Sequence, residues 1–195
     1  MRFKYIVLLN IFLISLTFAA DDVVNKFLSK LKHMSIVKID FEQRFYPVGY
    51  TSPIISYGDA YIENKPPFKI KITYKKPNQF VILYNGKNTT LYNKSSAYTY
   101  TSKGKNEEIK GLSVLNENIE DIFRPILTSY QDGYYEVLFI PRAKPFKDID
   151  YVILKLDKTL TPKSFYVYMP KKGVLYIKVL GFYNEKLNEG IFKLN

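Results

Sequence analysis

The sequence has no cysteine, no tryptophan and a single histidine, His33. Without cysteine the chain can form no disulfide, thiolate metal site or cysteine nucleophile, and one histidine cannot supply a site built from several imidazoles. A histidine general base is disfavoured for the same reason. Serine-hydrolase, phosphate-binding-loop, zinc-protease and dinucleotide-binding motifs are absent as well. We therefore expect no enzyme activity, no catalytic residues, no metal and no cofactor.

Neighbouring acidic residues do not change this expectation. Side chains that are adjacent in the sequence point apart on a strand or a helix, so they make poor acid/base pairs. The pairs in question are Asp21-Asp22, Glu107-Glu108 and Glu120-Asp121.

Aromatic and basic residues are abundant instead. Aromatic residues make up 16% of the 195 residues, with 18 Tyr and 14 Phe, and this favours pleated sheet. The net charge is +11, but the lysines are scattered along the chain rather than grouped. A basic balance suits either an anionic partner or a solvated surface. The scattering favours a solvated surface, and we expect no nucleic-acid partner.

The first twenty residues have the pattern of a secretory signal peptide. Arg2 and Lys4 precede an apolar stretch over residues 6–18, and Thr17 and Ala19 are small residues suited to a cleavage site. The apolar stretch is shorter than the roughly 20 residues that a membrane-spanning helix needs. We predict a signal peptide over residues 1–19, a single domain over residues 20–195, and export to the periplasm.

Most of the remaining chain has the period-two alternation of strands. Residues 68–75 are the clearest case, because apolar side chains alternate strictly with Lys and Thr. Asn85-Gly86 is a strong hairpin signal between two further strands. Strands are predicted at residues 37–45, 55–62, 68–75, 79–84, 89–92, 97–101, 134–140, 151–156, 163–169, 175–183 and 190–194.

Two segments have helical spacing. Residues 21–34 place Val23, Val24, Phe27, Leu28 and Leu31 three and four residues apart. Residues 116–130 show a similar period, and Pro125 inside that segment predicts a kink or a new helix start.

About ten to eleven antiparallel strands should curl into a barrel, a partial barrel or a sandwich, and the two helices should cover an opening or one apolar face. Such a sheet, rich in Phe, Tyr and Ile, encloses either a hydrophobic cavity or a filled core. Composition alone does not separate these two alternatives.

The order and spacing of several short motifs resemble the LolA family of periplasmic outer-membrane lipoprotein carriers. The matching segments run through most of residues 20–195: Phe41-Glu42-Gln43, Gly58-Asp59-Ala60-Tyr61-Ile62, Lys65-Pro66, Phe68 with Tyr74 and Pro77, Asn85-Gly86-Lys87 with Leu91-Tyr92, and residues 137–192. The resemblance implies an unclosed antiparallel β-barrel covered by a helical lid, with an apolar cavity.

The resemblance also implies a function. Members of the family take acylated lipoproteins from an ABC-type lipoprotein-releasing complex of the inner membrane and pass them to an outer-membrane receptor. We expect this chain to act in the same way, as a monomer that delivers lipoproteins to such a receptor or to the outer membrane itself. The alternatives are a lipid- or lipoprotein-sensing regulatory module of the same fold with no transport role, and a structural β-protein with a filled core.

Three sets of residues follow from the carrier hypothesis. Inward strand positions would line the cavity: Phe41, Phe45, Tyr61, Phe68, Ile70, Ile72, Tyr74, Phe80, Ile82 and Tyr84. The helices would supply a lid: Val24, Phe27, Leu28, Ile122, Phe123, Ile126 and Leu127. Lys65 stands where the family has a gating Arg, so the charge is kept but the forked geometry of a guanidinium is not.

Overall fold

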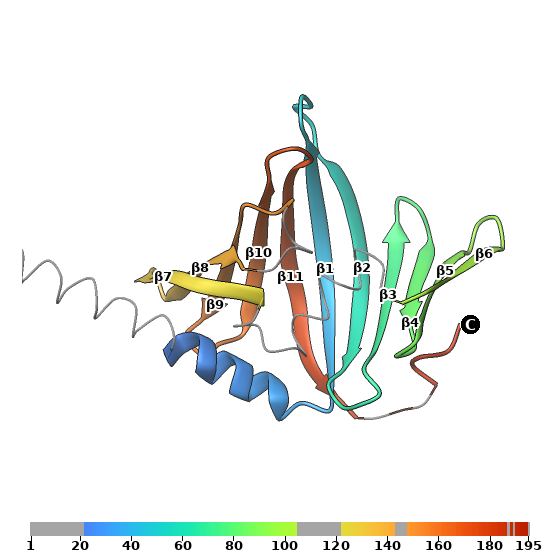
Figure 1. Cartoon of the computed structure of the whole chain (residues 1–195), viewed down its shortest axis with the longest axis horizontal. Helices are drawn as coiled ribbons and strands as arrows, with labels where there is room; N and C mark the ends of the chain where they lie inside the picture. The colour runs from blue at the N-terminus through green and yellow to red at the C-terminus, as the bar shows by residue number, and fades with distance from the viewer. Residues whose placement is uncertain (1–21, 105–121, 143–147, 187, 189, 195) are drawn as a thin grey trace, which may run out of the picture.

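Antiparallel strands make up most of the structure, a computed structural model of the chain (Figure 1). The structure describes residues 22–104, 122–142, 148–186, 188 and 190–194. In chain order the strands are β1 (Ile36–Pro47), β2 (Ile54–Glu63), β3 (Lys69–Lys76), β4 (Phe80–Tyr84), β5 (Asn88–Asn93), β6 (Tyr98–Lys103), β7 (Phe123–Gln131), β8 (Tyr134–Pro141), β9 (Tyr151–Asp157), β10 (Pro162–Met169) and β11 (Gly173–Glu185).

Within the residues that the structure describes, the strands form one 11-stranded sheet that does not close. Their order is β6-β5-β4-β3-β2-β1-β11-β10-β9-β8-β7, which leaves β6 and β7 at the two edges. The unclosed antiparallel sheet predicted from the sequence is confirmed. Within the described part of the chain, no helix combines the length and apolar character that crossing a bilayer requires. The predicted signal peptide lies outside the described residues.

Alternation of apolar and polar side chains explains how each strand is oriented. In β3, Ile70 and Ile72 are buried, whereas Lys69 and Lys71 lie on the opposite face. The β4–β5 hairpin is confirmed, with residues 85–87 in its loop. Asn85 Oδ1 accepts hydrogen bonds from the backbone N–H groups of Lys87 at 3.0 Å and Asn88 at 2.9 Å, and this stabilises the turn.

One face of the sheet carries the core, and we call it the inner face. Its buried side chains include Val37 and Ile39 of β1, Ile62 of β2 and Ile82 of β4, with Val137 of β8 from the other half of the sheet. Because these residues belong to a single cluster, the two halves of the sheet share one core. The opposite side of the sheet is the outer face.

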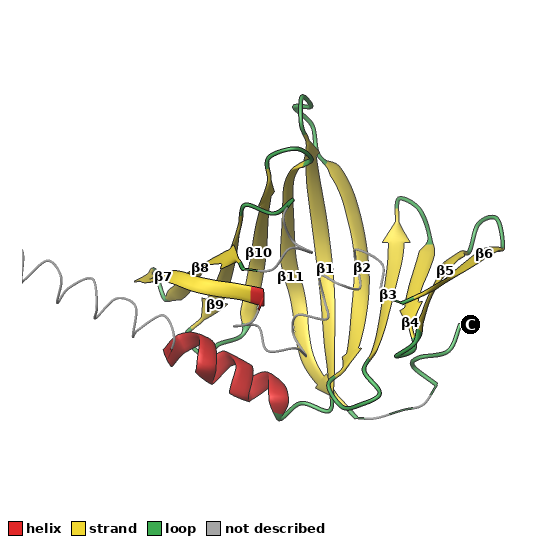
Figure 2. Cartoon of the chain, in the orientation of Figure 1, coloured by secondary structure: helices red, strands yellow, loops and turns green. Residues whose placement is uncertain are grey.

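A helix over residues 22–32 packs its apolar side against the inner face. Val24, Phe27 and Leu31 are each 2% exposed and belong to the core cluster. Their spacing of three and four residues places them on one side of the helix. Figure 2 shows this helix crossing the end of the sheet at which β1 begins. The helix predicted from residue 21 is therefore confirmed over its described residues.

Polar contacts hold the last turn of this helix. Lys30 Nζ donates to the backbone oxygen of Thr159 at 2.9 Å, in the turn between β9 and β10. Asn64 Nδ2, in the loop between β2 and β3, donates to the backbone oxygens of Leu31 at 2.9 Å and Met34 at 3.3 Å. The C-terminal end of the helix is thus bound to turns from both halves of the sheet.

The second predicted helix is wrong over residues 123–130, although Ile122 is helical. Residues 123–131 form the edge strand β7, with Phe123 paired to Pro141 and Pro125 paired to Phe139 (Figure 2). Proline lacks the N–H that an interior strand needs, but an edge strand tolerates it, above all beside a bulge. A register shift between Pro125 and Leu127 supplies that bulge. The rest of the predicted helix, residues 116–121, lies outside the described residues.

The strand predicted at residues 190–194 is also wrong. Ile191 N donates to Asn188 O at 3.0 Å and Lys193 N to Gly190 O at 3.3 Å, which is a turn geometry. The segment lies against β3, because Lys71 Nζ donates to Lys193 O at 2.7 Å.

Candidate functional site

The inner face divides into two zones of similar chemistry and different exposure. The packed zone belongs to the core cluster that the helix joins and includes Val37, Ile39, Ile62, Ile70 and Ile72, all buried. The open zone lies mainly on β10 and β11 and consists of apolar side chains that remain partly exposed: Phe45, Phe165, Val167, Leu175, Ile177 and Val179.

Strand pairing brings the open zone together. Leu175 of β11 lies opposite Phe45 of β1 and opposite Val167 of β10. One row further along the strands, Ile177 lies opposite Phe165. The open zone is therefore a continuous apolar stripe across three neighbouring strands.

Aromatic and polar side chains adjoin the open zone on β1, β3 and β4. The ring of Tyr74 stacks on Phe80 at 4.4 Å between centroids and meets Phe41 edge-on at 5.6 Å. The Tyr74 hydroxyl donates to Gln43 Oε1 at 3.3 Å. Gln43 lies between Phe41 and Phe45 along β1, so an amide group borders the apolar stripe.

Nine of the ten predicted cavity residues lie on the inner side. Five of them are buried core residues: Phe41, Ile70, Ile72, Ile82 and Tyr84. Three are partly buried and pack against the core: Phe68, Tyr74 and Phe80. Phe45 belongs to the open zone. Half of the predicted lining is therefore buried in the core, and four of the other five residues keep part of their surface exposed on the inner face.

Tyr61 was assigned to the wrong face. Its neighbours in β2, Ala60 and Ile62, are in the core, so Tyr61 points to the outer face. There the ammonium of Lys38 lies 5.7 Å from the centre of its ring. The prediction favoured the large aromatic residue for the interior, whereas the pairing register places the small Ala60 there.

The predicted lid residues lie in different elements. Val24 and Phe27 are buried on the helix, and Leu28 is partly buried against the core. Ile122 and Phe123 are also in the core, but Phe123 belongs to β7, as do Ile126 and Leu127. Only the first group lies on the helix that covers the inner face.

Lys65 and its neighbour Asn64 have different surroundings. Lys65 is exposed in the β2–β3 loop and forms no hydrogen bond or ion pair with any residue that the structure describes. Asn64 makes the contact between this loop and the helix. The gating role of Lys65 stays a prediction, and sequence reasoning missed Asn64. An amide directly after a strand, in the loop that faces the end of a helix, is the signal that could have identified it.

Sequence reasoning also missed the open-zone residues of β10 and β11. Residues 165–168 are Phe, Tyr, Val and Tyr, so both faces of β10 carry large side chains and alternation does not distinguish them. Only the pairing of Phe165 with Ile177 and with Leu154 identifies the inner face.

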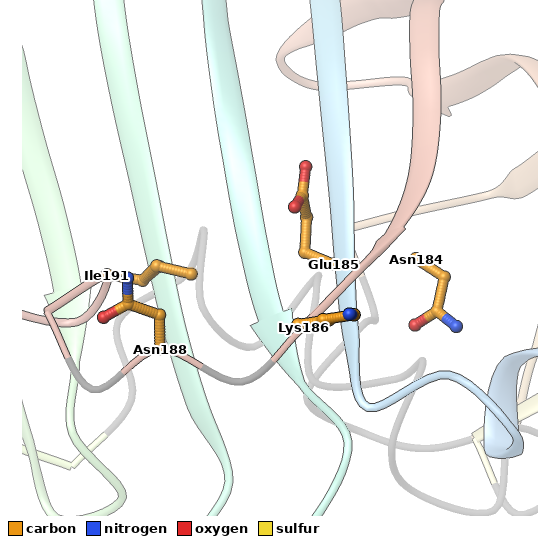
Figure 3. A pocket seen from close by; sticks show the side chains of 5 residues that line it. All are labelled: Asn184, Glu185, Lys186, Asn188 and Ile191. Carbon is orange, nitrogen blue, oxygen red and sulfur yellow. The ribbon is translucent and has the colours of Figure 1, made fainter.

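A separate depression lies where β11 continues into the C-terminal segment (Figure 3). Asn184, Glu185, Lys186, Asn188 and Ile191 line it. It is open to solvent and mainly polar, and it does not share the chemistry of the inner face.

An open antiparallel sheet with an apolar inner face crossed by a helix defines the class of half-barrel β-proteins. Within that class the chain belongs to the LolA family: the family described as "Outer membrane lipoprotein carrier protein LolA" matches residues 32–195. No curated protein matches the chain.

Solved structures share this fold at low sequence identity. An uncharacterised conserved protein of Thermus thermophilus superposes with a TM-score of 0.59 at 13% identity, covering 91% of this chain and 94% of that one. A putative outer-membrane lipoprotein-sorting protein domain of Vibrio parahaemolyticus gives 0.51 at 11%, covering 88% and 94%. MucB gives 0.52 at 11%, covering 91% of this chain and 63% of MucB. These likenesses establish the fold.

Proposed function

We propose that this protein is a non-enzymatic carrier that binds the acyl chains of lipoproteins on the open zone and moves them between membranes. The observation that carries the proposal is the partly exposed apolar stripe of Phe45, Phe165, Val167, Leu175 and Ile177 on the inner face. An apolar surface that the chain's own core leaves uncovered is favourably covered by an apolar ligand.

The energetics of lipid exposure explain why such a carrier is needed. At about 0.8 kcal/mol per CH₂, exposing one chain of roughly sixteen carbons to water costs about 12 kcal/mol. A lipidated protein therefore does not cross an aqueous compartment unaided. A stripe that is partly exposed, rather than enclosed, suits a carrier because the cargo must also be released.

Gln43 supports the same assignment. Its amide borders the open zone and already accepts a hydrogen bond from Tyr74. Binding sites for apolar ligands combine an apolar lining with a few polar groups that set orientation. Gln43 is placed to hydrogen-bond the ester or amide oxygen at the head of an acyl chain.

The cellular part of the proposal rests on family membership. A LolA-family chain with a signal-peptide pattern would work in the periplasm as a monomer. It would accept acylated lipoproteins from an ABC-type releasing complex of the inner membrane and pass them to an outer-membrane receptor or to the outer membrane itself.

Native mass spectrometry tests the binding step. The protein is purified with a co-expressed outer-membrane lipoprotein, and a second preparation carries the same lipoprotein with its acylated cysteine replaced. We expect a one-to-one complex only with the acylated form. If the protein binds neither acylated cargo nor free fatty acid nor apolar dyes, its inner face is filled and the carrier proposal is wrong.

A pair of variants in one strand locates the site. Ile177→Asp places a charge in the open zone and should abolish binding, because a carboxylate cannot be covered by an acyl chain without a large desolvation cost. Leu180→Asp, at a side chain that is 54% exposed in the same strand, is the matched control and should bind as the wild type does. Equal binding by both variants would remove the open zone as the site.

A further inference from the structure

The hairpin between β1 and β2 carries a cluster of exposed hydrophobic side chains at its tip. Val48 is 61% exposed, Tyr50 73%, Ile54 55% and Ile55 40%. Figure 1 shows this hairpin reaching beyond the other turns at the end of the sheet opposite the helix. Single exposed hydrophobic residues are common, but four within eight residues form a patch of the kind that marks an interaction site. We call residues 47–55 the hairpin tip.

The fold holds the hairpin tip in place. Tyr50 N donates to Pro47 O at 3.1 Å, and Gly49 has φ +83° at the third position of this turn, where glycine is favoured. Val48 N donates to Lys172 O at 3.2 Å, so the β10–β11 turn lies against the tip. The exposed side chains therefore belong to an ordered turn.

Cations surround this apolar tip. Residues 43–57 contain no Asp or Glu. Lys171 and Lys172 are exposed in the adjoining turn; Lys172 pairs with Asp148 at 3.1 Å, and Lys171 forms no ion pair with any residue in the described ranges. Lys76 lies at the β3 position opposite Tyr57, near the base of the hairpin.

The direction of the side chains indicates the kind of partner. Ile54 and Ile55 are consecutive in β2, opposite Phe45 and Arg44, so they point to opposite faces of the hairpin and yet both are exposed. The tip is therefore apolar on both faces. A protein groove would take up one face, whereas a lipid bilayer surrounds an inserted tip on every side.

We propose that the hairpin tip inserts into the surface of an anionic lipid bilayer, with Lys171 and Lys172 against the headgroups. Apolar side chains partition into the interface, and lysines beside them gain from the negative surface potential. This inference rests on the carrier proposal only in one respect, which is that a carrier of lipoproteins must come into contact with a membrane. The insertion itself needs no cargo and no open zone, so the two proposals can fail separately.

The absence of tryptophan allows a direct test. Tyr50→Trp gives the chain a single tryptophan at the tip, and Leu180→Trp is the matched control on β11. With vesicles of phosphatidylethanolamine and phosphatidylglycerol, the Tyr50→Trp emission should shift to the blue and be quenched by brominated acyl chains, while the control should show neither effect. An unshifted, unquenched tryptophan at position 50 would overturn the proposal.

Vesicle flotation separates the two components of binding. Val48→Ser with Tyr50→Ser should lower the partition coefficient roughly tenfold, because two apolar side chains leave the interface. Lys171→Gln with Lys172→Gln should lower it by a similar factor and weaken its salt dependence, whereas Lys32→Gln with Lys158→Gln, exposed at the other end of the sheet, should not. These changes leave the core intact, and circular dichroism verifies folding.

Either of two results would contradict the proposal that the tip inserts into an anionic bilayer. One is equal partitioning of the wild type and the Val48→Ser, Tyr50→Ser variant. The other is equal binding to phosphatidylcholine vesicles, which would remove the role of the lysines. Capture of the tip by a protein partner, with no partition into vesicles, would assign the patch to a protein surface instead.

Discussion

The packed zone and the open zone of the inner face are built from the same residue types and differ in how fully they are buried. Ile70 in the packed zone is 0% exposed and belongs to a core cluster that includes Phe27 and Leu31 of the helix. Ile177 in the open zone keeps part of its surface exposed, although it also contacts the core. The comparison shows that an apolar inner face does not identify a binding site by itself. Which part is core and which part a ligand can reach depends on how fully each side chain is buried.

The largest difference between the zones should appear in stability. Ile70→Ala should lower the free energy of unfolding by about 2–5 kcal/mol, whereas Ile177→Ala should cost about 1 kcal/mol, because a partly exposed site loses less buried surface and leaves no closed cavity. Urea denaturation followed by circular dichroism measures both. Equal losses would mean that the two zones are equally packed.

The next effect concerns the contact that holds the helix over the packed zone. Asn64→Ala removes the hydrogen bonds to the backbone oxygens of Leu31 and Met34 and should cost about 1–2 kcal/mol. It should also speed the release of a bound fatty acid. Asn78→Ala, in the exposed β3–β4 turn, is the control and should alter neither quantity. A variant with wild-type stability and release would show that the Asn64 hydrogen bonds do not hold the helix.

The free energy of unfolding should depend on pH through Asp157, in the turn that Lys30 contacts. Burial acts to raise the pKa of Asp157, but hydrogen bonds from the Thr159 side chain, the Thr161 backbone and Lys163 outweigh it and hold this pKa well below its usual range. A carboxyl whose pKa is lowered by folding stabilises the fold above its unfolded value near 4, and this stabilisation is lost as the pH falls toward the folded value. Unfolding free energy should therefore fall on acidification below about pH 4.

Asp157→Asn tests this effect. The variant keeps a side-chain acceptor but does not titrate, so its stability should depend less on pH over that acidic range. Asp132→Asn, an exposed change in the β7–β8 turn, should keep the wild-type dependence. Identical slopes for the wild type and Asp157→Asn, measured by urea denaturation at several pH values, would remove Asp157 as the cause.

The smallest stability effect is expected at Lys65. Its exposed side chain forms no hydrogen bond or ion pair with the described residues, so Lys65→Leu should change the free energy of unfolding by less than about 0.5 kcal/mol. If Lys65 gates the helix, fatty-acid release or lipoprotein transfer should slow. Equal release and transfer rates for the wild type and Lys65→Leu would remove that role.

The sheet could be predicted from the sequence because alternation is a local property. Residues 68–75 alternate strictly, and β3 forms at residues 69–76. Alternation failed where both faces of a strand carry large side chains, as in β10, and where the interior takes a small residue, as at Ala60 beside Tyr61. In those strands the pairing partners, distant in sequence, determine which face is buried.

The edge strand β7 shows a second limit of predicting structure from local sequence patterns. Ile122, Phe123, Ile126 and Leu127 have helical spacing, and Pro125 was interpreted as a helix kink or start. Pairing with β8 prevails over that local pattern, and the bulge next to Pro125 shifts the period of the side chains. The helix contact of Asn64 was equally hidden, because it joins residues that are about thirty positions apart.

The helix is attached unevenly, and this determines how the core can be uncovered. Its directional contacts, from Lys30 and Asn64, lie at the last turn, whereas Val23, Val24 and Phe27 toward its start are held by apolar packing. Directional hydrogen bonds resist rotation and sliding, while apolar contacts separate without a preferred direction. We therefore expect any movement of the helix to be a swing about its C-terminal end. That movement would begin on the side where β7, β8 and β9 lie. It would expose more of the apolar inner face and so enlarge the open zone without unfolding a strand.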